Sequence, residues 1–165
     1  MIYLAHGASG NADSMKPWIS GLARHGLDAR AVGLPVRKAE EVTELYFAQV
    51  DDYASAIIGG HSFGGRVASL LAATRPPRGL VLLSYPLHRP GHPDELRTDH
   101  WSDITCPVLL LSGESDQFAR IELLRAAVRL LPNGRLITYP GVRHGLLPVK
   151  QDALERIAEF VDELG

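Results

Sequence analysis

The sequence predicts an α/β domain built on a mostly parallel, six-stranded sheet with helices on both faces. Short apolar runs alternate with longer amphipathic stretches along most of the 165 residues, which is typical of parallel strands joined by crossover helices. Two of the runs are apolar at every position, as expected of strands covered on both faces. A chain of this length has room for one domain, so we expect residues 1–165 to form a single unit.

Six strands are expected, each a short apolar or β-branched run that ends at glycine, proline or polar residues. In chain order they are 2–5, 28–33, 55–59, 79–84, 108–112 and 135–139.

Apolar residues at helical spacing predict helices between the strands, and we interpret two such faces as core. The helix that begins near Ala119 is expected to stop at 132–134, which reads Pro-Asn-Gly, and Pro140 closes the last strand. The two faces comprise Val42, Leu45, Tyr46 and Val50, and Leu154, Ile157, Ala158 and Val161.

The segment 85–103 departs from this alternation. It carries three prolines and three histidines between two buried strands, and it is too polar and too broken for a plain crossover helix. We interpret it as an insertion over one end of the sheet. The sequence leaves open whether it is an ordinary surface excursion or takes part in binding.

Composition excludes several classes of partner. A formal net charge of −2 gives no basic surplus, so binding to DNA or RNA is not expected. No apolar run approaches the ~20 residues that a membrane-spanning helix needs. Residues 1–5 are apolar but lack a positively charged leader, so they are expected to form a strand and not a signal peptide. We therefore predict a soluble, cytoplasmic protein of unspecified oligomeric state.

Cysteine and histidine give no sign of a metal or disulfide. The single cysteine, Cys106, cannot form an internal disulfide, and its neighbours place it at the entrance to a buried strand. His88, His92 and His100 have no spacing that resembles a zinc site. No metal and no other cofactor is expected.

The strongest local signal is the hexapeptide 60–65, Gly-His-Ser-Phe-Gly-Gly, which contains a G-x-S-x-G motif. It follows an expected strand and opens an expected helix, the context in which a serine lies on a sharp, exposed turn. Glycine two positions to either side of Ser62 avoids collision with neighbouring backbone in such a strained turn. We therefore predict that Ser62 is a nucleophile.

A serine nucleophile needs a base, and the base needs an acid that orients it. Glu114 and Asp116 both follow the strand at 108–112. We favour Asp116 because it lies farther along a loop that can reach the base, whereas Glu114 can cap the turn or pair with an arginine. His144 follows the last strand, a position that favours the role of base over that of an ordinary surface histidine.

Two backbone N–H groups are expected to bind the oxyanion that forms during attack. One belongs to Phe63, at the start of the helix after the nucleophile, and the other to Ala8, in the loop after the first strand. His6, in the same loop, is expected to hydrogen-bond locally and not to transfer protons.

Four motifs make the chain similar to the α/β-hydrolase superfamily over nearly its whole length. They are HGASG at 6–10, GHSFGG at 60–65, GESDQF at 113–118 and GVRH at 141–144. A YPLHRPG segment at 85–91 resembles a hallmark of a small branch with dienelactone-hydrolase-like and testis-expressed-protein-like members. This resemblance implies a minimal α/β-hydrolase fold that lacks the two leading strands and a long lid.

Together these residues indicate a serine hydrolase that cleaves a small ester or thioester through an acyl-enzyme. A non-catalytic binding module of the same fold is the alternative, and a perhydrolase or a C–C bond hydrolase would use the same three residues. An open cleft is expected, and the candidates for its walls are Tyr85, Leu87, His88, Trp101 and Phe118.

Overall fold

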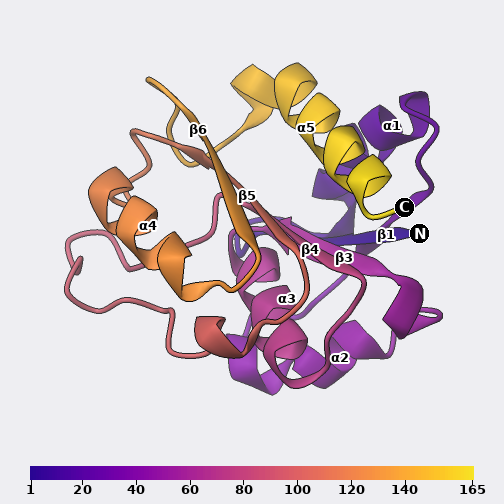
Figure 1. The fold of residues 1–165 in the computed structure, drawn as a ribbon, viewed down its shortest axis with the longest axis horizontal. Coiled ribbons are helices and arrows are strands. Elements are labelled where there is room, and N and C mark those ends of the chain that lie inside the picture. The colour runs from indigo at the N-terminus through magenta and orange to yellow at the C-terminus, as the bar shows by residue number, and fades with distance from the viewer.

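Six strands form one sheet in the computed structural model, which describes residues 1–165 (Figure 1). Every pair of neighbouring strands is parallel, in the order β2-β1-β3-β4-β5-β6. The predicted six-stranded parallel sheet is therefore confirmed. The strands are β1 Ile2–Ala5, β2 Ala29–Val32, β3 Ile57–His61, β4 Gly79–Leu83, β5 Val108–Gly113 and β6 Gly134–Tyr139.

The strand order reverses at β1, which pairs with β2 on one side and with β3 on the other. In open parallel sheets, ligands bind beyond the carboxyl ends of the strands at such a reversal. The β1–β3 register places Ala5 beside Gly60, so the loop that follows β1 and the turn that follows β3 meet at this edge.

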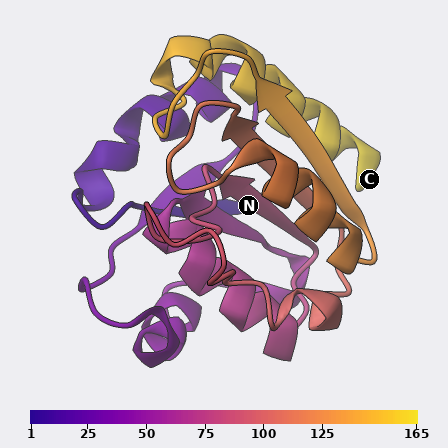
Figure 2. The ribbon, with the colours of Figure 1, turned by 90° about the vertical axis from the view of Figure 1, so that its left-hand side faces the viewer.

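Helices cover both faces of the sheet (Figures 1 and 2). The larger core cluster has 26 buried residues and lies under α2, α3 and α4, and the smaller has 16 and lies under α1 and α5. Side chains alternate between the two clusters along β4, because successive residues of a strand point to opposite faces. The helices are α1 Lys16–Arg24, α2 Thr43–Phe47, α3 Phe63–Thr74, α4 Ile121–Ala127 and α5 Lys150–Glu163, with short 3-10 turns η1 Ala12–Met15, η2 Ala39–Glu41, η3 Tyr53–Ser55, η4 Trp101–Asp103, η5 Val128–Leu130 and η6 Leu147–Val149.

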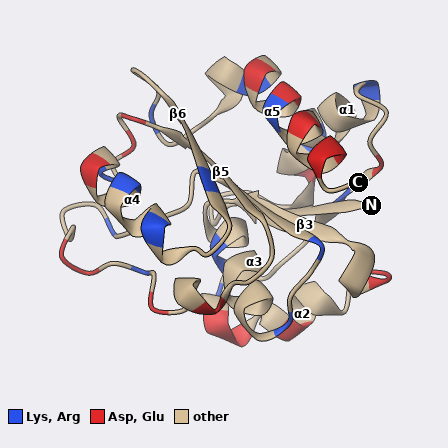
Figure 3. Ribbon diagram, viewed as in Figure 1, with Lys and Arg blue, Asp and Glu red and all other residues tan.

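Charge is nearly absent from the strands and is spread over the helices and loops (Figure 3). The strands contain only two charged residues, Arg30 and Arg135, and these lie in the edge strands β2 and β6. The four inner strands are apolar because helices cover them on both sides.

The amphipathic face predicted at 42–50 is only partly correct. α2 is five residues long, and Leu45 is 47% exposed, whereas Val42 and Tyr46 are buried. The Tyr46 hydroxyl shares its proton between the carbonyls of Tyr3 and Gly59 and accepts from the Gly59 N–H, so this side chain fixes which side of the short helix meets the sheet. Leu45, about 100° around the helix from Tyr46, therefore points to solvent.

The segment 85–103 contains no regular element apart from η4. Its two ends are anchored in the core, where the rings of Tyr85 and Trp101 pack edge to face with their centroids 5.0 Å apart. Tyr85, Leu87 and Trp101 belong to the larger core cluster, so the segment packs on the face of the sheet that α3 and α4 also cover. That it is an insertion over one end of the sheet stays an interpretation from the sequence.

Candidate active site

Ser62 lies on the turn between β3 and α3, with φ of 48° and ψ of −114°. A non-glycine residue seldom adopts positive φ, and such strain is concentrated at functional sites. The flanking glycines permit this turn. A Cβ on Gly60 would lie 2.5 Å from the Ala5 carbonyl oxygen, and one on Gly64 would lie 2.5 Å from the same oxygen. The close approach of β1 to the turn therefore excludes any larger residue at either position.

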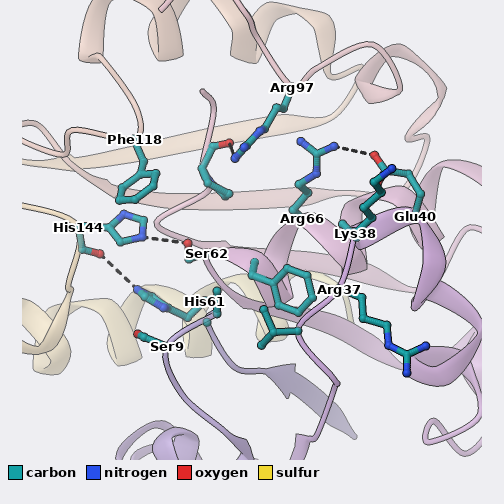
Figure 4. Close-up of a pocket in the computed structure, with 16 residues that line it drawn as sticks. Ser9, Arg37, Lys38, Glu40, His61, Ser62, Arg66, Arg97, Phe118 and His144 are labelled. Atoms are coloured by element: carbon teal, nitrogen blue, oxygen red, sulfur yellow. Dashed lines mark hydrogen bonds and ion pairs between the residues drawn. The ribbon is translucent and has the colours of Figure 1, made fainter. Parts of the chain in front are cut away.

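A continuous hydrogen-bonded chain joins Ser62, His144 and Asp116. Figure 4 shows its link between Ser62 and His144. Ser62 Oγ lies 2.9 Å from His144 Nε2, and His144 Nδ1 lies 2.8 Å from Asp116 Oδ2. The other carboxylate oxygen of Asp116 accepts from the backbone N–H of Phe118 at 2.8 Å. The Asp116 side chain is fully buried, so both of its oxygens are held by the protein. The structure thus brings together three side chains that lie far apart in the sequence.

Glu114, the alternative acid, lies elsewhere. Its carboxylate pairs with Arg125 at 3.1 Å and accepts from the Thr138 hydroxyl at 2.8 Å. Of the two acids considered from the sequence, only Asp116 contacts His144.

Backbone bonds between the loops after β5 and β6 bring Asp116 and His144 together. The N–H of Ser115 donates to the carbonyl of Val142 at 2.9 Å. A Cβ on Gly113 would lie 2.1 Å from the same carbonyl oxygen, so the loops can approach this closely only with glycine there. The Phe118 ring packs beside the imidazole of His144, with centroids 4.3 Å apart.

Ala8 and Phe63 both line the cleft beside Ser62, and the backbone N–H of neither residue donates to another group of the chain. The N–H of Gly64 donates to the carbonyl of His6 at 3.0 Å, which ties the loop after β1 to the start of α3. The helix begins at Phe63, so the positive end of its dipole faces the same place. The arrangement can bind an oxyanion.

His6 is buried and makes two hydrogen bonds. Its Nε2 accepts from the N–H of Leu34 at 3.0 Å, so Nδ1 carries the proton and donates to the Gly7 carbonyl at 2.8 Å. Both ring nitrogens are engaged, and His6 holds the loop as the sequence indicated.

His61 precedes Ser62 and stands next to His144, with ring centroids 5.2 Å apart. Its Nε2 lies 3.3 Å from the His144 carbonyl oxygen. Burial lowers the pKa of His61, and this effect outweighs the hydrogen bond to the His144 carbonyl, which raises it. His61 therefore stays neutral at neutral pH.

The cleft above Ser62 has a volume of about 600 Å³. Of the five predicted wall residues, only Phe118 lines it. Tyr85, Leu87 and Trp101 are buried in the core, and His88 is held by the Arg89 carbonyl and the Arg120 N–H outside the cleft. The prediction was wrong for these four residues of the segment 85–103, because their side chains are buried inside the protein instead of facing the cleft.

Several residues of the cleft were not singled out from the sequence. Residues 36–40 enter from the connection between β2 and α2, Arg66 from the first turn of α3, and Pro86 and Arg97 from the segment 85–103. The position of 36–40 just after a strand, at the edge that carries Ser62, was the available signal. No sequence signal pointed to Arg97, because its position at the cleft depends on the path of an irregular segment.

The structure contains no group of three or more His, Cys, Asp or Glu side chains that could hold a metal ion. None of its helices is long and apolar enough to span a membrane.

A family model described as an alpha/beta hydrolase domain matches residues 30–163. Over 59 residues the chain is 44% identical to a non-heme chloroperoxidase from Burkholderia pyrrocinia, a match that covers 35% of this chain and 21% of that protein. Over 60 residues it is 35% identical to a bifunctional esterase/perhydrolase from Acinetobacter calcoaceticus, covering 36% and 22%. The matched segments thus span about a fifth of the length of these curated relatives.

The fold is also similar to that of a solved monoacylglycerol lipase from Paleococcus ferrophilus. The TM-score is 0.84 at 16% identity, and the match covers 99% of this chain and 94% of the lipase. At this identity the similarity concerns the fold alone.

Proposed function

The chain belongs to the alpha/beta hydrolase domain family, and from this premise we propose that it is a serine hydrolase that cleaves a small ester or thioester. The observation that carries the proposal is the hydrogen-bonded chain from Asp116 through His144 to Ser62, next to two backbone N–H groups without partners. The esterase/perhydrolase relative adds support for ester chemistry.

In the first half of the reaction, Ser62 Oγ attacks the substrate carbonyl carbon while His144 Nε2 takes the hydroxyl proton. The carbonyl oxygen becomes an oxyanion that accepts hydrogen bonds from the N–H groups of Ala8 and Phe63. The tetrahedral intermediate then collapses, the bond to the leaving alcohol or thiol breaks, and His144 gives that group its proton. An acyl-enzyme remains on Ser62.

In the second half, water replaces the leaving group. His144 takes a proton from the water, whose oxygen attacks the acyl carbon, and then returns the proton to Ser62 as the carboxylic acid departs. Asp116 holds the Nδ1–H tautomer throughout and stabilises the imidazolium of His144. A neutral His61 adds no positive charge next to that imidazolium.

Labelling with a fluorophosphonate and hydrolysis of 4-nitrophenyl butyrate test this proposal. The wild type should be labelled and active, whereas Ser62→Ala should lose the label and at least ~10³-fold in kcat/KM. Ser102→Ala, which removes an exposed serine outside the cleft, is the matched control and should behave as the wild type. An unlabelled wild type, or equal rates for the wild type and Ser62→Ala, would favour a non-catalytic binding module.

The relative with perhydrolase activity favours a second candidate reaction at the same site. In perhydrolysis, hydrogen peroxide takes the place of water and the acyl-enzyme is released as a peracid. Peracetic acid formed from acetate and hydrogen peroxide, and absent with Ser62→Ala, would establish it. Membership of the dienelactone-hydrolase-like and testis-expressed-protein-like branch stays a prediction from the YPLHRPG segment.

A further inference from the structure

The cleft beside Ser62 is positively charged although the chain as a whole is not. Four cationic residues line it, Arg37, Lys38, Arg66 and Arg97, against the single carboxylate of Glu40. The formal net charge of the chain is −2, so the acidic surplus lies outside the cleft. A cleft lined by one sign of charge concentrates ligands of the opposite sign.

One of these cations is already paired. Arg66 Nη2 lies 2.7 Å from Glu40 Oε1, and the Arg66 side chain is only 20% exposed. Its other terminal nitrogen, Nη1, is buried and has no hydrogen-bond partner. Arg66 therefore keeps an unused donor after its charge has been balanced by Glu40.

Of the three other cations, none has an ion-pair partner inside the protein, and Arg97 is the one that is half-buried, whereas Arg37 and Lys38 are exposed. The guanidinium of Arg97 makes only a long contact of 3.5 Å with the Pro86 carbonyl oxygen. Burial lowers the pKa of Arg97, and repulsion from Arg66 lowers it further. Figure 4 shows the guanidinium of Arg66 between Arg97 and Glu40, so the unpaired charge lies beside the paired one.

The backbone of Arg97 is fixed on both sides. Its N–H donates to the Leu87 carbonyl at 2.8 Å, and its carbonyl accepts from the Tyr85 hydroxyl at 2.6 Å. Tyr85 and Leu87 are themselves buried. Buried residues therefore hold an unpaired arginine at the cleft, although an uncompensated, half-buried charge destabilises the folded protein.

We propose that the substrate is an ester or thioester that carries a carboxylate, which binds at Arg97 with Arg66 beside it while the scissile carbonyl lies at Ser62. This inference rests on the proposed serine hydrolase function and adds the class of its substrate. A guanidinium suits a planar carboxylate because two parallel N–H groups can meet its two oxygens. Because Arg97 is the only half-buried cation of the cleft without a carboxylate partner, the inner part of the cleft matches a single negative charge. Arg37 and Lys38, both exposed, attract the anion to the cleft.

The kinetic experiment compares two esters that differ only in charge. They are the mono-4-nitrophenyl ester of adipate and its methyl-capped, neutral counterpart, measured with the wild type at low ionic strength. We expect kcat/KM for the anionic ester to be at least about tenfold higher, mainly through KM, and the ratio to fall as salt screens the charges.

Variants at Arg97 separate charge recognition from a structural role. Arg97→Gln should lower the ratio of anionic to neutral kcat/KM about tenfold or more, and Arg97→Lys should restore part of it. Arg129→Gln, which removes an exposed arginine outside the cleft, is the matched control and should leave the ratio unchanged. Equal kcat/KM for the two esters in the wild type, or equal losses on both in Arg97→Gln, would overturn the inference.

A binding measurement keeps this inference distinct from the catalytic proposal. Calorimetric titration of Ser62→Ala with adipate and with neutral adipamide requires no turnover. Adipate should bind at least about tenfold more tightly, and Arg97→Gln in the same background should remove the difference. If adipate binds no better than adipamide, the inference fails even for an active enzyme. If adipate is preferred but no ester is cleaved, the anion site stands and the hydrolase proposal fails.

Discussion

At the scale of single residues, Ser62 adopts a backbone conformation with positive φ on a turn that glycine flanks two positions away on either side. Ser62 could be predicted because glycine on both sides and a strand-to-helix context are needed to expose it, and the structure gives the collisions that any larger residue would cause. The choice between Asp116 and Glu114 rested on loop length alone. Their different hydrogen-bond partners became visible only once β5 and β6 were placed side by side.

Asp116→Asn should keep the fold and lower kcat for an ester by ~10³- to 10⁴-fold. The amide would offer an N–H to His144 Nδ1, so that the imidazole no longer presents a free Nε2 to Ser62. Glu114→Gln is the matched control and should retain wild-type kcat, because that carboxylate contacts Arg125 and Thr138 instead. Steady-state kinetics of both variants on 4-nitrophenyl butyrate would show which of the two carboxylates supports catalysis. A large loss in Glu114→Gln together with normal rates in Asp116→Asn would reverse the assignment.

At the scale of elements, strands were predicted more accurately than the segments between them. Inner strands are apolar on both faces, so β4 and β5 could be located from the sequence to within a residue. The helix expected at 42–50 is shorter because hydrogen bonds from Tyr46 to two strands fix its orientation. From the sequence, Tyr85 and Trp101 in the segment 85–103 could either line a binding cleft or belong to the core. Tertiary packing places both in the core.

The turn between β3 and α3 offers a test at this scale. Gly64→Ala should lower the free energy of unfolding by about 2 kcal/mol or more, because the new methyl group would lie 2.5 Å from the Ala5 backbone and neither β1 nor α3 can move freely. Gly145→Ala is the matched control, since nothing lies within 4 Å of its Cβ, and it should change stability by less than ~0.5 kcal/mol. Urea unfolding followed by circular dichroism measures both, and similar stabilities would show that the turn tolerates a side chain.

At the scale of the whole molecule, residues 1–165 contribute to one sheet with a core cluster on each face. We propose that they unfold as a single unit, as their number and composition predicted, and the cytoplasmic location stays a prediction from the sequence. His100 links the segment 85–103 to α3, because its Nε2 lies 2.8 Å from the Ser69 hydroxyl. Burial, and after it the charge of Arg66, lower the pKa of His100 to about 4.

This shift predicts how stability depends on pH. Between pH ~6.5 and about 4 the unfolded chain binds a proton at His100 that the folded chain does not, so stability falls as the pH falls through this window. After discounting for partial exposure, the loss from this residue is about 1–2 kcal/mol. His100→Gln should flatten the dependence over that range. Urea unfolding at pH 7 and pH 4.5 gives the comparison, and an unchanged slope in the variant would assign the effect to other groups.

The residues of the candidate catalytic triad and the charged residues that line the cleft come from different stretches of the chain. Ser62, Asp116 and His144 follow the strands β3, β5 and β6, whereas most of the charged wall comes from the connection 36–40 and the segment 85–103. Substitutions at the exposed positions of 36–40 and at Arg97 can therefore alter which molecule is accepted while Ser62, Asp116 and His144 keep their positions. The rest of the segment 85–103 has less freedom to change, because Tyr85, Leu87 and Trp101 are buried in the core. The charged wall of the cleft can therefore diverge in evolution through single side chains, while the sheet and the turn that carries Ser62 stay unchanged.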